Sequence, residues 1–273
     1  MRCTTRIATL ASLLLRILMI WIALPIALTY VAVCGLMYAR QRDLVYYPQL
    51  TRVDAANTDF ALPVGDDVVL RGWVVNPGQP RALIYFGGNA ESVEVNRDTF
   101  AHWFPGHTVY LVAYRGFGAS DGSPSEQDLT ADALTLFDHV RDRHAKGQID
   151  VIGRSLGSGV ASSVAARRPV RRLALVTPFD SLVDVGKQHY PWLPVDLIAQ
   201  DRYDSVAHLA HYQGPLLVVR AGRDEVVPPA NTQRLLASLT RPVQVLEIPQ
   251  ADHSNVGSDP AFARTLKGFF SGP

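Results

Sequence analysis

Residues 150–159 read DVIGRSLGSG, and this stretch decides the fold. It contains a Gly-x-Ser-x-Gly pattern in which Ser155 lies between Gly153 and Gly157. The apolar residues 149–152 indicate a short strand, and the small residues that follow the pattern indicate a helix packed close to a sheet. A strand, a sharp turn and a helix are the context that this serine motif requires, whereas the pattern alone is common by chance.

The physics of such a turn explains its residue types. A very tight strand-to-helix turn holds the serine in a strained backbone conformation with its hydroxyl projecting outward. The two glycines leave room for neighbouring backbone, and the helix N-terminus offers unpaired N–H groups to a developing oxyanion. We therefore predict that Ser155 is a nucleophile. The alternative, a Gly/Ser-rich turn without chemistry, does not call for the strand and the helix on either side.

From Leu44 onward, strand-like and helix-like segments alternate. This alternation predicts an α/β fold with a mainly parallel sheet and helices on both faces. The expected strands are 67–75, 82–86, 108–114, 149–152, 173–177, 216–221 and 243–248, and the expected helices are 125–145, 156–167, 229–239 and 260–270.

The partners of the serine are sought at the ends of later strands. A serine hydroxyl becomes a good nucleophile only when a base takes its proton, and this motif's chain order is serine, then acid, then histidine. Asp224 follows the predicted strand 216–221, and His253 follows the predicted strand 243–248. Because ligands bind at the carboxyl edge of such sheets, we predict that His253 is the base and that Asp224 orients it.

Three other acids are candidates by position. Glu225 is expected to point elsewhere, and Asp252 is too close to His253 in sequence for the usual geometry, so we expect it to order the loop. Asp180 follows the predicted strand 173–177 and stays open as the alternative acid.

An oxyanion hole needs a second backbone N–H, from the loop after an earlier strand. Residues 86–91 read FGGNAE and follow the strand predicted at 82–86. Glycines there let the backbone approach a ligand closely. We assign the two donors as the backbone N–H groups of Asn89 and Leu156. An ordinary Gly-Gly turn is the alternative.

The N-terminal region has a different composition. Residues 17–39 read ILMIWIALPIALTYVAVCGLMYA and carry no formal charge. As a helix they exceed the ~30 Å hydrocarbon core of a bilayer. We predict a tail at 1–16, a single transmembrane anchor at 17–39 and a hydrolytic domain at 44–273. A cleaved signal peptide is the alternative, but its apolar region is about 7–15 residues long and ends in a small-residue cleavage site.

Charge says little about partners. The formal net charge is +1 and no basic run is present, so no nucleic-acid partner is expected. The cysteines, Cys3 and Cys34, both lie in the N-terminal region, so no disulfide framework reports the compartment. Three arginines precede the anchor and three follow it closely, and the acid-free tail favours an extracytoplasmic domain. These arginines are Arg2, Arg6 and Arg16, then Arg40, Arg42 and Arg52.

Five segments together resemble the Bem46-like (ABHD13- and ABHD17-like) branch of the α/β-hydrolases, and the resemblance runs from about Leu44 to Phe270. It implies an α/β-hydrolase fold, a Ser155–Asp224–His253 triad and oxyanion donors at Asn89 and Leu156. Many relatives have His-Gly-Asn where this chain has Gly87-Gly88-Asn89, which leaves the order of that loop to be explained. The segments are YFGGNAE, AYRGFGASDGSPSE, VIGRSLGSGVA, AGRDEVVP and ADHSN.

The resemblance also implies a short cap at about 181–209, which excludes a large lid domain. Residues 189–194, HYPWLP, are expected either to line an acyl site or to pack in the core. The predicted activity is two-step acyl transfer from a small-molecule or lipid-like ester or thioester to water, with neither metal nor organic cofactor. A peptidase or acyltransferase using the same triad is the alternative, and a catalytically idle membrane scaffold is a third reading.

Overall fold

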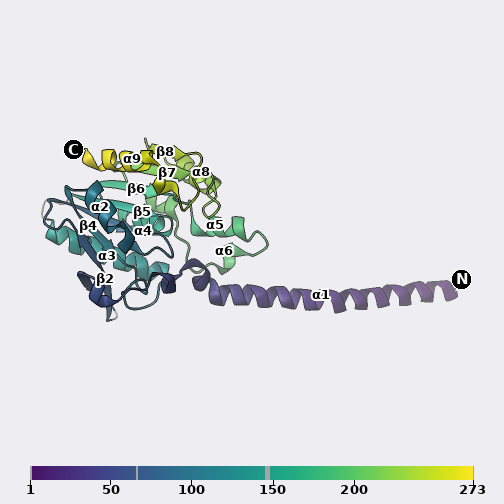
Figure 1. Cartoon of the computed structure of the whole chain (residues 1–273). Coiled ribbons are helices and arrows are strands. Elements are labelled where there is room, and N and C mark those ends of the chain that lie inside the picture. Colours follow the sequence, from purple (N-terminus) through teal and green to yellow (C-terminus); the bar gives the residue numbers. More distant parts are fainter. Residues whose placement is uncertain (1, 66, 145–147, 273) are drawn as a thin grey trace.

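A mixed sheet forms the centre of the structure (Figure 1). The structure is a computed structural model that describes residues 2–65, 67–144 and 148–272. Within that part of the chain the sheet has eight strands in the order β1-β2-β4-β3-β5-β6-β7-β8. Strands β1, β2 and β4 pair antiparallel, and all further pairs are parallel, which confirms the predicted mainly parallel sheet. The strands are β1 (Phe60–Val64), β2 (Val68–Val75), β3 (Arg81–Phe86), β4 (His107–Val112), β5 (Ile149–Arg154), β6 (Arg172–Val176), β7 (Leu216–Ala221) and β8 (Gln244–Ile248).

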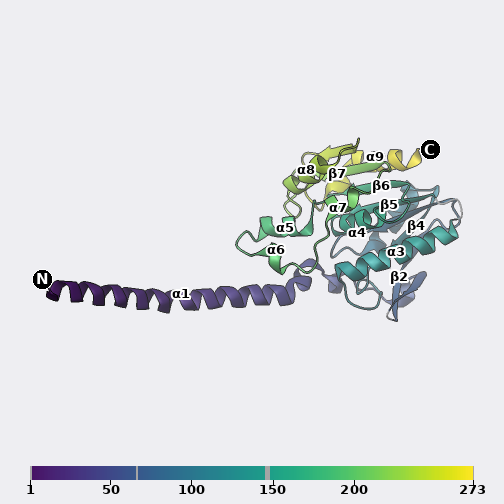
Figure 2. The ribbon, with the colours of Figure 1, turned by 180° about the vertical axis from the view of Figure 1, so that it is seen from behind.

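Helices cover both faces of the sheet (Figures 1 and 2). Successive strand side chains point to opposite faces, so Ile84 of β3 joins one core cluster while Leu83 and Tyr85 join the other. The first cluster lies under α3 (Glu126–Arg143), α4 (Leu156–Ala165), α7 (Ser205–Leu209) and α8 (Pro229–Ser238), and the second lies under α2 (Arg97–Trp103) and α9 (Pro260–Ser271).

The expected elements are present with small shifts at their ends. Ser125 caps α3, because its hydroxyl accepts a hydrogen bond from the Asp128 backbone N–H at 3.1 Å. The predicted end of that helix, Ala145, lies outside the described residues. Strand β1 and helix α2 were not expected, since β1 is a five-residue edge strand containing Pro63 and α2 is only seven residues long.

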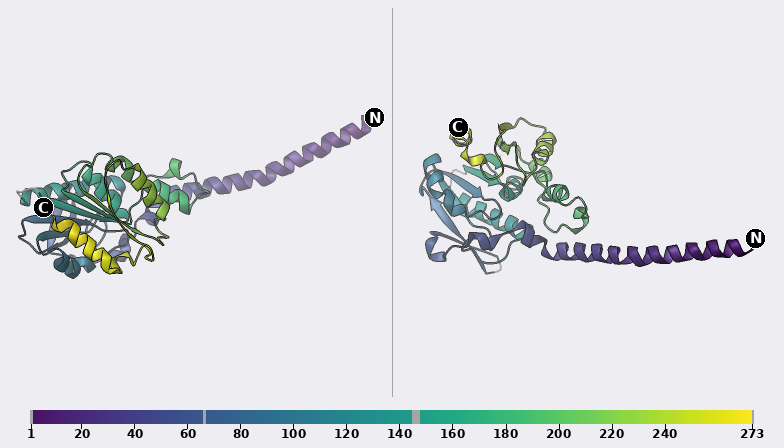
Figure 3. Two further views of the ribbon diagram at one scale, coloured as in Figure 1. Left: turned by 90° about the horizontal axis from the view of Figure 1, so that it is seen from above. Right: turned by 45° about the vertical axis from the view of Figure 1, so that its right-hand side comes forward.

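Helix α1 (Arg2–Val45) runs through the predicted tail and anchor without a break and enters the domain (Figures 1 and 3). The candidate span Arg16–Thr51 begins inside α1 and contains an 18-residue window with a mean hydropathy of 2.4, so it is long and apolar enough to cross a membrane. The chain after α1 is firmly packed: Tyr46 is buried, and its hydroxyl lies 2.9 Å from that of Tyr203. The boundary expected between anchor and domain is therefore bridged by continuous structure.

The segment between β6 and β7 includes the region 181–209, where a short cap is expected, and is called the cap below. It contains α5 (Leu182–His189), α6 (Val195–Ile198) and α7. Helices α5 and α6 project from the sheet edge and lie beside the domain end of α1 (Figures 1 and 3).

Candidate active site

The turn between β5 and α4 has the strained geometry that the sequence predicts. Ser155 has φ 51° and ψ −120°, a conformation that L-residues rarely adopt. A Cβ atom on Gly153 would lie 2.3 Å from the Gly157 carbonyl oxygen, and one on Gly157 would lie 2.1 Å from the Phe86 carbonyl oxygen. Because both obstacles are backbone atoms, only glycine fits on either side of the serine.

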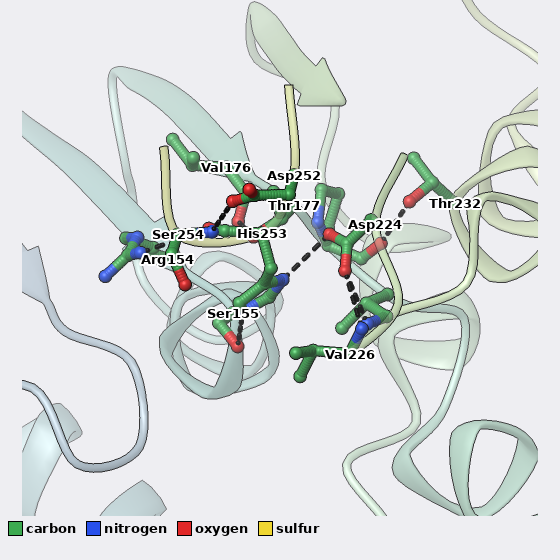
Figure 4. Close-up of polar contacts among 12 residues, drawn as sticks. Arg154, Ser155, Val176, Thr177, Asp224, Val226, Thr232, Asp252, His253 and Ser254 are labelled. Carbon is green, nitrogen blue, oxygen red and sulfur yellow. Dashed lines mark hydrogen bonds and ion pairs between the residues drawn. The ribbon is translucent and has the colours of Figure 1, made fainter. Parts of the chain in front are cut away.

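Three side chains from separate strand ends meet at this turn (Figure 4). His253 Nε2 lies 2.9 Å from Ser155 Oγ, and His253 Nδ1 lies 2.7 Å from Asp224 Oδ2. The carboxylate is held in place because its Oδ1 accepts the backbone N–H groups of Val226 at 3.0 Å and Val227 at 2.7 Å. With its Nδ1 proton donated to Asp224, the neutral imidazole presents Nε2 as the acceptor for the Ser155 hydroxyl.

The other acids make different contacts. Asp180 accepts a hydrogen bond from Asn231 Nδ2 at 2.7 Å and pairs with Arg234 at 2.5 Å, away from His253. Asp252 accepts the backbone N–H groups of the two residues after His253, at 2.8 and 2.9 Å, and so orders that loop as expected. Asp224 is therefore the carboxylate that the fold brings to the histidine.

The two predicted oxyanion donors both lie beside the serine. Asn89 and Leu156 line the same cavity as Ser155. Leu156 is the first residue of α4, so its backbone N–H has no partner within that helix. Gly88 lies close by, since a Cβ atom added to it would be 3.5 Å from Ser155 Cβ. Both predicted donors therefore border the cavity at Ser155, which is where an oxyanion hole would need them.

A buried carboxylate orders the Gly-Gly-Asn loop that lacks the histidine of many relatives. Glu91 Oε2 accepts the Gly88 backbone N–H at 2.7 Å and Arg154 Nη1 at 3.0 Å. Its Oε1 accepts the Tyr85 hydroxyl at 2.6 Å and Asn96 Nδ2 at 2.9 Å. Burial acts to raise the pKa of Glu91, but the Arg154 charge and these hydrogen bonds outweigh it, so the pKa lies below its ordinary value.

Arg154 joins this network to the base. Its Nη2 donates to the His253 backbone carbonyl at 3.2 Å (Figure 4). Its Nη1 donates to Glu91 Oε2 at 3.0 Å. The Arg154 guanidinium thus links the Gly-Gly-Asn loop after β3 to the loop that carries His253. No role was predicted for Glu91 or Arg154, although both lie inside the motifs quoted above. The available signal was a charged side chain within a turn that otherwise consists of small residues.

An apolar cavity of about 400 Å³ opens from Ser155. Its walls come from the cap, from the loop after Asp224 and from the domain end of α1, which contributes residues on both sides of Ala39. Of the 189–194 cluster, Tyr190 lines the cavity, whereas Trp192 does not and is 54% exposed. The main lining side chains are Met37, Gln41, Leu44, Val45, Phe179, Val183, Val185, Tyr190, Leu193, Val226 and Val227.

Comparison with known proteins agrees with the fold. A family model described as the alpha/beta hydrolase fold matches residues 81–203. An uncharacterised protein of Mycobacterium tuberculosis is 35% identical over 257 residues, which cover 85% of this chain and 89% of that protein. This chain belongs to the α/β-hydrolase superfamily. Within it, the lysophosphatidylserine lipase ABHD12 of Danio rerio is 33% identical over 141 residues, covering 45% of this hydrolase and 37% of the lipase.

Two further comparisons extend over most of the hydrolase. The alpha/beta hydrolase domain-containing protein WAV2 of Arabidopsis thaliana is 26% identical, covering 76% of this chain and 78% of its own. The solved structure of a Pyrococcus furiosus esterase superposes with a TM-score of 0.66 at 17% identity, covering 81% of this chain and 95% of that one. At that identity the superposition supports the fold alone.

Proposed function

We propose that this protein is a membrane-anchored serine hydrolase that cleaves the ester or thioester bond of acyl substrates. The observation that carries the proposal is the hydrogen-bonded series Ser155–His253–Asp224, with contacts of 2.9 and 2.7 Å. Its first member, Ser155, lines an apolar cavity. A nucleophile, a base and an orienting carboxylate in this order are what acyl transfer by serine requires.

The proposed reaction has two steps, acylation of Ser155 and hydrolysis of the acyl-enzyme, and the same groups act in both. Ser155 Oγ attacks the acyl carbonyl carbon while His253 Nε2 accepts the hydroxyl proton, and Asp224 stabilises the imidazolium that forms. The backbone N–H groups of Asn89 and Leu156 bind the oxyanion of the tetrahedral intermediate. His253 then protonates the leaving group, and a water activated by the same imidazole releases the acid and restores Ser155.

The chemistry of the cavity supports an acyl chain as the bound group. Its lining is mostly aliphatic and aromatic, as in pockets that bind apolar ligands. Away from Ser155 and Asn89, the polar residues of the lining are Gln41, His189, Asp201 and Glu225. The similarity to a lysophosphatidylserine lipase supports an ester-linked lipid over a peptide. Placement in the Bem46-like branch is part of the proposal and rests on the five segments quoted above.

Anchoring by α1 is the other part of the proposal. Its apolar segment is long enough for one crossing, and its apolar side chains are exposed, as those of Ile20, Trp21 and Ile26 show. Contiguous exposed apolar surface of this size marks a contact with lipid or protein. We propose that residues 17–39 cross the bilayer and that the hydrolase domain lies on the extracytoplasmic side, as the acid-free tail favours.

A fluorophosphonate probe tests the proposed chemistry on the full-length protein in detergent. The wild-type protein should be labelled and should hydrolyse p-nitrophenyl butyrate, and Ser155→Ala should lose both while keeping its circular dichroism spectrum. Ser158→Ala is the matched control, because Ser158 lies in the first turn of α4 but does not line the cavity. Its hydroxyl donates to the Ser155 backbone carbonyl at 2.6 Å. Labelling that persists in Ser155→Ala contradicts the assignment.

A further inference from the structure

The far end of the cap contacts α1 inside its apolar run. The Tyr30 hydroxyl donates to the Trp192 backbone carbonyl at 2.9 Å. Nearer the domain, Gln41 Nε2 donates to the Ile198 carbonyl at 2.9 Å, and the Gln200 backbone N–H donates to Gln41 Oε1 at 2.7 Å. The cap therefore lies along α1, as the views in Figure 3 also show for α5 and α6.

The place of Tyr30 in α1 sets the depth of the outermost contact. Tyr30 precedes Arg40 by ten residues, which is about 15 Å of helix axis at 1.5 Å per residue. In a chain anchored as proposed above, Arg40 and Arg42 mark the polar end of the run, because charged side chains avoid hydrocarbon. Even if the Tyr30 side chain leans fully toward the domain, the Trp192 carbonyl lies on the hydrocarbon side of Arg40.

The exposed residues of this end of the cap suit a lipid environment. We define the cap tip as Tyr190, Trp192 and Leu197, whose exposed fractions are 38%, 54% and 84%. Aromatic side chains with a polar atom concentrate at bilayer interfaces. The one formal charge between these residues, Asp196, is paired with Lys187 at 2.6 Å.

Backbone polar groups within a bilayer must find partners in the protein. The Trp192 carbonyl, on the hydrocarbon side of Arg40, has such a partner in the Tyr30 hydroxyl. The Ile198 carbonyl is paired with Gln41 at the polar end of the run. The contacts between cap and anchor are thus the kind that immersion of the cap would need.

We propose that the cap tip is immersed in the bilayer beside α1 and that the cavity opens sideways into the lipid. The inference rests on the proposed function and names its substrate class: an acyl ester resident in the membrane. Both walls of the cavity support this route, since Met37 and Val45 come from α1 while Tyr190 and Leu193 come from the cap. An acyl chain passing between them reaches Ser155 without crossing water.

Tryptophan fluorescence tests the immersion without any use of activity. The full chain is reconstituted into liposomes of phosphatidylcholine brominated on its acyl chains, which quench only nearby tryptophans. Trp21→Phe removes the anchor tryptophan, and the matched protein carries Trp192→Phe as well; Trp73 and Trp103 remain in both. We expect quenching in the first protein that is absent from the second. Equal responses of the two proteins overturn the proposal, because they leave the cap tip in water or against another protein.

The rate of lipid hydrolysis tests the route. Leu197 does not line the cavity, so Leu197→Glu should leave p-nitrophenyl butyrate hydrolysis unchanged. The same variant should slow hydrolysis of 4-methylumbelliferyl oleate in liposomes by about tenfold, because a charge is costly in hydrocarbon. Val245→Glu, at an exposed position on the distant strand β8, is the control and should change neither rate.

The two proposals fail in different ways. An unchanged oleate rate in Leu197→Glu, or an equal loss on both esters, overturns the lateral route. A wild-type protein that hydrolyses neither ester refutes the proposed function, whereas the quenching result still reports the position of the cap.

Discussion

Glu91→Gln is a sharp test of the network behind the oxyanion loop. The two carboxylate oxygens of Glu91 accept four donors: the Gly88 N–H, Arg154, the Tyr85 hydroxyl and Asn96. A glutamine keeps one acceptor oxygen. Its NH2 group replaces the other oxygen, and where it faces the Gly88 N–H and Arg154, which can only donate, no hydrogen bond forms. About two of the four hydrogen bonds are lost, at about 1–3 kcal/mol for each buried partner left unsatisfied. We therefore expect the free energy of unfolding to fall by about 2–6 kcal/mol.

The pH dependence of that difference has a definite sign. The pKa of Glu91 is lowered in the folded protein, so its stabilising effect is fully present above the unfolded value of about 4.3. The effect is lost as the pH falls through the lower folded pKa. The stability gap between wild type and Glu91→Gln should therefore be largest near pH 7 and should narrow below about pH 4.

Urea denaturation of the detergent-solubilised protein at pH 7 and at low pH measures both quantities. Because the loop carries Asn89, the proposed oxyanion donor, kcat for p-nitrophenyl butyrate should fall while KM changes little. Glu94→Gln is the matched control, three residues further on in the short 3-10 helix Val93–Asn96, and it should lie within about 0.5 kcal/mol of wild type. If Glu91→Gln is as stable as this control at pH 7, the reasoning about the network is refuted.

Three further predictions concern the acid of the triad, the glycine after the serine and the packing of Tyr46. Asp224→Asn should lower kcat by about 10⁴-fold because His253 loses its orientation, whereas Asp180→Asn should cost stability and leave turnover nearly intact; a larger turnover loss from Asp180→Asn in the ester assay would reverse the assignment of the acid. Gly157→Ala should abolish turnover or folding, because its Cβ would lie 2.1 Å from the Phe86 carbonyl oxygen, and a folded, fully active variant would contradict the close approach. Tyr46→Phe should lower the unfolding midpoint in a thermal melt, because it leaves the buried Tyr203 hydroxyl without its partner at 2.9 Å.

Local patterns were sufficient to predict the centre of the fold and the three groups at its edge. The Gly-x-Ser-x-Gly turn needs a strand before it and a helix after it, and both are readable within about twenty residues of Ser155. Asp224 and His253 follow buried strands, and parallel strands bring their carboxyl ends to one edge whatever the intervening chain does. Strand β1 and helix α2 escaped prediction because short elements carry too few residues for a clear period.

The surroundings of these groups depend on contacts between residues far apart in the chain, which no local pattern encodes. Glu91 and Arg154 lie 63 positions apart in the sequence, with β4 between them in chain order. They meet because β3 and β5 are neighbours in the sheet. The choice of Asp224 over Asp180 was likewise decided by which loop packs against His253. Hydropathy also marks where α1 is apolar, but it does not mark the residue at which the proposed anchor ends and the domain begins. Only the docking of the cap against α1 makes Met37 and Gln41 part of the cavity that holds Ser155.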